Sequence, residues 1–191
     1  MTTAILIVLM VAATAAGALA ARQEESVAPQ TRLAWTRTIL YWAFTLLVAF
    51  EMAAGGLWDL LRIEYVRVVL THLGYPLYLL YIIGVPRIPC AFVLLLPRFH
   101  RLKEWAYAGA FFDYMGAAAS HLLTGDGAKA WVGPFLLSLF TLASWAMRPA
   151  ARRLERPDKA AGPRAAAWGV PALIVLGMLV FAYLTLPKGA P

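Results

Sequence analysis

The sequence predicts an all-α membrane protein, a polytopic bundle of transmembrane helices. Of its 191 residues, 62% are hydrophobic and 14% are charged, whereas soluble domains have roughly 45–50% apolar and about 25% charged residues. Mean hydropathy is +0.69. This composition excludes a disordered chain and a disulfide-built secreted module. The length fits one bundle rather than two domains.

Six segments are long and apolar enough to cross a bilayer, which takes about 20 residues of helix. They lie at 4–21, 38–58, 75–96, 104–123, 131–147 and 168–186. The first has a second interpretation as a signal peptide, because Ala18-Leu19-Ala20 resembles a cleavage site. We favour a retained helix, since cleavage would move the basic loops to the wrong side of the membrane. The chain then divides into an N-terminal helix and loop (1–37), a four-helix core (38–149) and a basic linker with a last helix (150–191).

Lysine and arginine are concentrated in the loops on one side of this arrangement, chiefly at 22–37, 98–103 and 148–164. The positive-inside rule places these loops in the cytoplasm and both termini outside. These basic loops, which set the orientation of the protein in the membrane, then account for the net charge of +7. We expect contact with membrane lipid and no nucleic-acid partner. The sequence leaves open whether the protein binds copies of itself.

Three charged residues fall within predicted spans, where an ionisable side chain usually faces the bundle interior and has a partner. At a rise of 1.5 Å per residue, Glu51, Arg87 and Asp113 all lie near the middle of the bilayer. Two carboxylates and a guanidinium at one depth predict a shared cluster. A structural ion-pair network and a ligand or proton-relay site both fit this cluster.

Neighbouring residues extend this prediction. His121 shares a helix face with Asp113 and is assigned to the same polar cluster. Pro86 and Pro89 flank Arg87 and kink its helix, which favours a pocket, although a purely structural kink is the alternative. Pairing His121 with His72 gives too few ligands for a metal site, and none is predicted.

Three aromatic residues near predicted span ends suit the interfacial belt of a membrane protein. They are Trp58, Trp105 and Tyr107.

Several motifs resemble the DoxX-like family of bacterial membrane proteins. They are Leu73-Gly74-Tyr75-Pro76-Leu77-Tyr78, Leu102-Lys103-Glu104-Trp105-Ala106-Tyr107-Ala108-Gly109, Phe112-Asp113 through Gly116-Ala117 to Ser120-His121, Ala143-Ser144-Trp145-Ala146-Met147-Arg148-Pro149, and Glu51 with Gly55-Gly56-Leu57-Trp58-Asp59-Leu60. The resemblance covers about residues 38–149 and implies a four-helix core in the bacterial inner membrane. Pro86 and Pro89 depart from the family pattern. Most members have no assigned activity. DoxX and DoxD proteins are associated with thiosulfate:quinone oxidoreductase and terminal-oxidase complexes.

Three functions follow as hypotheses, and the sequence does not decide whether the protein is an enzyme. The leading one is an accessory protein that binds a lipophilic small molecule or a partner subunit at the charged cluster. The second is a subunit of a quinone-linked oxidoreductase, for which a quinone is the cofactor. In it Arg87 or His121 would bond a quinone carbonyl, and Asp113 or Glu51 would pass the proton. The third is a small transporter.

Overall fold

The computed structural model describes residues 32–149, 152–153 and 165–186. Within these ranges the chain forms six helices and no strand. The helices are α2 (Arg32–Leu61), α3 (Glu64–His72), α4 (Leu79–Leu95), α5 (His100–Leu123), α6 (Ala128–Met147) and α7 (Ala165–Leu184). The first predicted span, 4–21, lies outside the described residues.

The other predicted spans are helical, but their lengths differ from the expectation. Among the described helices, only α2 from Trp35 onward and α6 combine the length and apolarity of a membrane span, while α4 and the Trp168–Leu184 part of α7 are apolar but shorter. The structure therefore supports an all-helical bundle without confirming six spans. α4 starts late because Gly74 adopts a φ of 78° and Pro76 follows it, so the chain turns before the helix begins.

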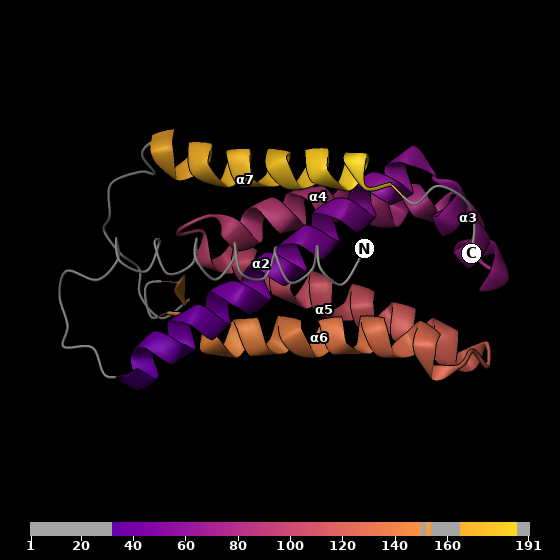
Figure 1. The fold of residues 1–191 in the computed structure, drawn as a ribbon, viewed down its shortest axis with the longest axis horizontal. Coiled ribbons are helices and arrows are strands. Elements are labelled where there is room, and N and C mark those ends of the chain that lie inside the picture. Colours follow the sequence, from indigo (N-terminus) through magenta and orange to yellow (C-terminus); the bar gives the residue numbers. More distant parts are fainter. Residues whose placement is uncertain (1–31, 150–151, 154–164, 187–191) are drawn as a thin grey trace.

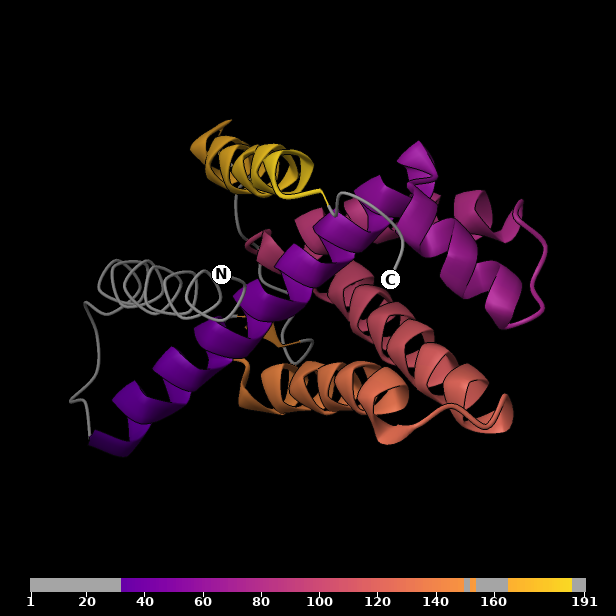
Figure 2. The ribbon, with the colours of Figure 1, turned by 45° about the vertical axis from the view of Figure 1, so that its right-hand side comes forward.

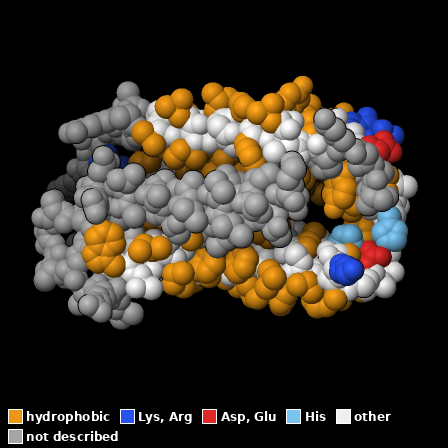
Figure 3. Space-filling model, viewed as in Figure 1, with side chains coloured by type: hydrophobic (Ala, Val, Ile, Leu, Met, Phe, Trp, Pro, Cys, Tyr) orange, Lys and Arg blue, Asp and Glu red, His pale blue; other side chains and the backbone are white. Residues whose placement is uncertain are grey.

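The bundle is organised around α2, which runs obliquely past the other long helices (Figures 1 and 2). α2 packs against α4, α6 and α7, and α5 packs against α6 and α4. The short helix α3 was not expected from the sequence; it lies at one end of the bundle (Figure 1). The flanks are largely hydrophobic, and charged and histidine side chains gather at the α3 end (Figure 3).

Glycines set the distance between α2 and α4. A Cβ placed on Gly84 would lie 2.8 Å from the Cβ of Asp59, and one on Gly56 would lie 2.9 Å from the Cβ of Arg87. Neither position has room for a side chain. This close approach places the side chains of Asp59 and Arg87 beside one another.

Two basic side chains bind the C-terminal end of α4. The Lys103 side chain is fully buried and donates hydrogen bonds from Nζ to the carbonyls of Val93 (2.8 Å) and Leu94 (2.7 Å). Arg152 donates more weakly to the carbonyls of the two residues that follow, at 3.3–3.4 Å. Cations at a helix C-terminus satisfy unpaired carbonyls and oppose the helix dipole.

Candidate functional site

The centre of the candidate site is Arg87, which joins three helices. Its Nε and Nη2 donate to Oδ2 of Asp113 on α5, at 3.0 and 2.8 Å. Its Nη1 donates to Oδ2 of Asp59 on α2, at 2.7 Å. All three side chains are largely buried, with exposed fractions of 19% for Arg87, 7% for Asp59 and 19% for Asp113. Arg87 and Asp113 therefore meet, as the sequence predicted, and a carboxylate from α2 completes the cluster.

That α2 carboxylate is Asp59 and not Glu51, which corrects the predicted cluster. No hydrogen bond or ion pair links Glu51 to another described residue. Helix α2 continues past Trp58 to Leu61, so Asp59 stays inside the bundle. Residues spaced by four share a helix face, and Glu51, Gly55 and Asp59 lie along the side of α2 that meets Arg87. The depth argument selected Glu51, whereas the carboxylate that contacts Arg87 lies about 12 Å farther along α2.

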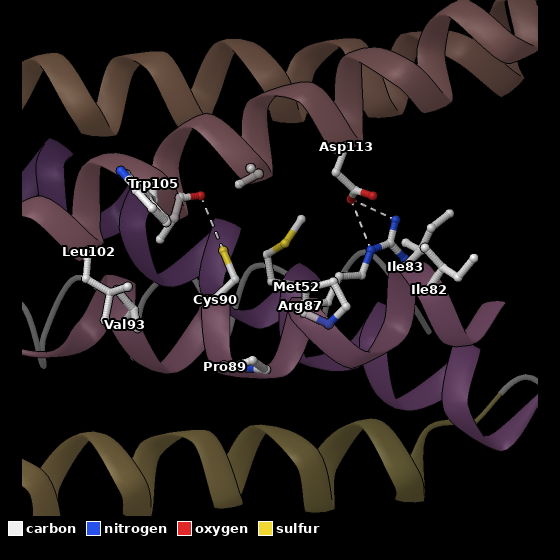
Figure 4. Close-up of a pocket in the computed structure, with 14 residues that line it drawn as sticks. Met52, Ile82, Ile83, Arg87, Pro89, Cys90, Val93, Leu102, Trp105 and Asp113 are labelled. Atoms are coloured by element: carbon white, nitrogen blue, oxygen red, sulfur yellow. Dashed lines mark hydrogen bonds and ion pairs between the residues drawn. The ribbon is translucent and has the colours of Figure 1, made fainter. Parts of the chain in front are cut away.

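An apolar groove opens beside this cluster, between α4 and α5 (Figure 4). We call it the α4–α5 groove; its volume is about 440 Å³. Arg87 and Asp113 lie at one end, while Trp105, Ile82 and Leu102 on its rim are 78%, 60% and 46% exposed. The groove is lined by Met52, Ile82, Ile83, Pro86, Arg87, Pro89, Cys90, Val93, Leu102, Trp105, Ala106, Gly109, Ala110 and Asp113.

A second cavity, the α3 cavity, lies on the other side of the same ion pair. Its volume is about 420 Å³, and it is more polar than the groove. Its walls come from α3, the 73–79 turn and the facing parts of α2, α4 and α5. It is lined by Asp59, Tyr65, Val66, Val69, Leu70, Leu73, Tyr75, Leu79, Leu80, Ile83, Arg87, Phe112, Asp113, Gly116, Ala117, Ser120 and His121. Arg87 and Asp113 thus border both cavities.

His121 lies in the wall of the α3 cavity, but its hydrogen-bond partner is outside the predicted cluster. It donates from Nδ1 to Oδ2 of Asp126 at 2.6 Å, and His72 donates from Nε2 to Oδ1 at 2.7 Å. The hydrogen bonds from His121 and His72 hold the pKa of Asp126 below its ordinary value. The carboxylate between them joins the end of α3 to the α5–α6 turn. In the part of the chain that the structure describes, no three His, Cys, Asp or Glu side chains are grouped to hold a metal.

The three predicted interfacial aromatics have different environments. Trp105 is 78% exposed on the groove rim, and Trp58 donates from Nε1 to the Ala182 carbonyl of α7 at 3.4 Å. Tyr107 differs from the expectation because it is buried, with an exposed fraction of 3%. Its hydroxyl is 2.8 Å from Oγ of Ser144, and the Arg148 guanidinium lies over its ring. Residues two positions apart in an α-helix lie on different sides of it, so Trp105 is exposed while Tyr107 is buried.

The fold and the site define a class of protein: a helical bundle with hydrophobic flanks, apolar helices of membrane length and an ion-pair cluster buried between three helices. Together these features indicate a membrane protein. The chain belongs to the DoxX-like family, whose model matches residues 43–144. No curated protein and no solved structure matches it.

Proposed function

We propose that this protein binds a lipophilic small molecule in the α4–α5 groove, within the bacterial inner membrane and with both termini outside. The observation that carries the proposal is an apolar groove that ends at a buried ion pair and has an exposed apolar rim. Ligand sites are typically apolar cavities of about 300–1,000 Å³ with a few polar groups that fix orientation. An apolar tail would lie along the groove, with its polar head at Arg87 and Asp113.

The ion pair retains capacity to recognise such a head group. A guanidinium has five N–H donors, and the described contacts of Arg87 use one from each of Nε, Nη1 and Nη2. The remaining donors suit a carbonyl oxygen. Both bonds from Arg87 to Asp113 end at Oδ2, so Oδ1 is left to accept from a hydroxyl. A head group with a carbonyl, a hydroxyl or both would fit.

A donor and a proton acceptor side by side also suit a quinone, which is the ligand of the oxidoreductase alternative. In that alternative Arg87 would donate to a quinone carbonyl and Asp113 would exchange a proton with it. The groove contacts would be the same, so binding is tested first. Titration with a short-chain quinone, followed by a redox assay with the membrane fraction, separates this alternative from simple binding.

Native mass spectrometry of the intact protein in mild detergent tests the groove. A Cβ on Gly109, in the groove wall, would meet nothing within 4 Å, so Gly109→Trp fills the groove without displacing backbone. Gly133 on α6 is equally open and lines neither cavity, so Gly133→Trp is the matched control.

We expect one defined lipophilic molecule on the parent protein and on Gly133→Trp, and at least a tenfold loss of it on Gly109→Trp. Equal retention by all three proteins, or bulk phospholipid alone, would refute binding in the groove. A co-purified protein that Gly109→Trp releases would instead favour a partner subunit at this face.

A further inference from the structure

We propose that the α3 cavity is a second binding site and that it takes a small organic cation with an aromatic or apolar body. This site is separate from the proposed function, because its ligand would enter from the α3 end and contact a different set of walls. It shares only Arg87, Asp113 and Ile83 with the α4–α5 groove. Charge, aromatic lining and access each support the assignment.

The first argument is charge. Asp59 and Asp113 both border the α3 cavity, and among the residues that the structure describes Arg87 is the one guanidinium paired with them. With both carboxylates ionised, the cluster has one negative charge in excess. The hydrogen bond that a described residue gives to Asp59 ends at Oδ2, so its Oδ1 remains as an acceptor for the cation, whereas Oδ1 of Asp113 is assigned above to the groove ligand. An excess buried charge is costly unless it is paired, and a bound cation would pair it.

The second argument is the lining. Tyr65 from α3, Tyr75 from the following turn and Phe112 from α5 all border the cavity. The face of an aromatic ring attracts a cation, and quaternary ammonium groups are recognised in this way. Val66 and Leu70 supply apolar wall for the rest of the molecule. The combination of carboxylates and rings distinguishes this cavity from the groove, whose wall has Trp105 as its aromatic residue.

The third argument is access. Helix α3 contains no fully buried residue, and its end is joined to the bundle through the His72–Asp126 bridge. Tyr75 also contacts Ser120, with their hydroxyl oxygens 2.9 Å apart. Charged and histidine side chains gather at this end of the molecule (Figure 3), so a water-soluble cation reaches it more readily than it reaches the hydrophobic flanks.

Protons would compete with the cation for the same carboxylates. The titratable and charged groups that line the cavity are Asp59 on α2, Tyr65 on α3, Tyr75 in the turn, Arg87 on α4, and Asp113 and His121 on α5. A proton on a carboxylate of this cavity would remove the excess negative charge that attracts the cation, so affinity for the cation should fall as the pH falls.

Binding of benzyltrimethylammonium to the full-length protein in detergent tests the inference. Neopentylbenzene has nearly the same shape without the charge, and benzenesulfonate carries the opposite charge. By saturation-transfer NMR or calorimetry, we expect the cation to bind at least about tenfold more tightly than either, and more weakly at lower pH. Equal binding of the cation and its neutral isostere, or an affinity independent of pH, would overturn the inference.

Variants then locate the site. Asp59→Asn removes one carboxylate, and Glu64→Gln is its charge-matched control because Glu64 is exposed and paired with Arg67 on α3. Val66→Trp fills the cavity without changing charge. We expect Asp59→Asn and Val66→Trp to lose cation binding at least tenfold and Glu64→Gln to keep it.

If Asp59→Asn fails to fold, the Val66→Trp variant decides the question. Unchanged cation binding by a folded Val66→Trp protein would overturn the site. Loss of the groove ligand in Gly109→Trp tests the proposed function separately.

Discussion

The close contact between α2 and α4 makes Gly84→Ala an informative perturbation. The added Cβ would lie 2.8 Å from the Cβ of Asp59, 3.2 Å from the carbonyl oxygen of Gly56 and 3.3 Å from Cγ of Leu60. Two of these three contacts are with backbone or Cβ atoms, which cannot turn aside as the end of a long side chain can. The helices themselves must therefore separate.

The expected magnitude follows from these distances. Non-bonded carbon atoms rest about 3.5–4.0 Å apart, so α2 and α4 must separate by about 1 Å at this point. Overpacking of this kind costs about 1–3 kcal/mol, against at most ~1 kcal/mol gained from replacing a helical glycine. Asp59 would move away from Arg87, whose Nη1 is now 2.7 Å from its Oδ2. Stability and binding at the cluster should both decrease.

Thermal unfolding in detergent, followed by tryptophan fluorescence, measures the first effect. For a chain of this size, 1 kcal/mol corresponds to about 2–4 °C in Tm, so we expect Gly84→Ala to melt about 2–12 °C below Gly133→Ala, which gains the same helix propensity. Gly133→Ala is the control, because a Cβ there meets nothing within 4 Å. A Gly84→Ala protein that melts with Gly133→Ala would refute the close-contact reasoning.

Three further predictions follow from the polar contacts. Arg87→Gln leaves two buried carboxylates without their guanidinium and should cost about 3 kcal/mol or more; an unchanged melting temperature beside an Arg67→Gln control would contradict this. Lys103→Met removes two charge-assisted bonds to carbonyls at the end of α4 and should cost about 1.5–3 kcal/mol in the same assay; a gain in stability would show that burying the ammonium costs more than these two bonds contribute. Asp126 has a folded pKa below its ordinary 3.8, so its stabilising effect is full above that pH and is lost as the pH falls further. Hydrogen exchange of α3 should therefore be faster in Asp126→Asn than in the parent above pH 3.8 and converge with it at lower pH; a constant difference would refute the role of Asp126.

Much of the candidate site was predictable from the sequence. Arg87 and Asp113 stood out because charged side chains are rare in apolar helices and need partners there, and the structure joins them directly. Asp59 was missed because it follows Trp58, an aromatic residue expected at the membrane interface. Its signal was its spacing from Gly55 and Glu51, since residues four apart share a helix face.

The α3 region was the least predictable part. Helix α3 has nine residues, some of them polar or charged, so it is far shorter than the roughly 20 apolar residues by which a spanning helix is recognised. His72 and Asp126 are far apart in the chain, and their contact depends on how two turns meet at the end of the bundle.

The sequence by itself determined the helical class, the approximate limits of the long helices and the need of Arg87 for a partner. Each of these depends on the composition and hydropathy of a single segment of the chain. Tertiary structure alone decided which carboxylate on α2 pairs with Arg87, which aromatic residue is buried and where the two cavities lie. The physical reason is that these properties depend on helix rotation and close approach. Gly56 and Gly84 set the close approach of α2 and α4, and the side chains that meet there set how the two helices are rotated.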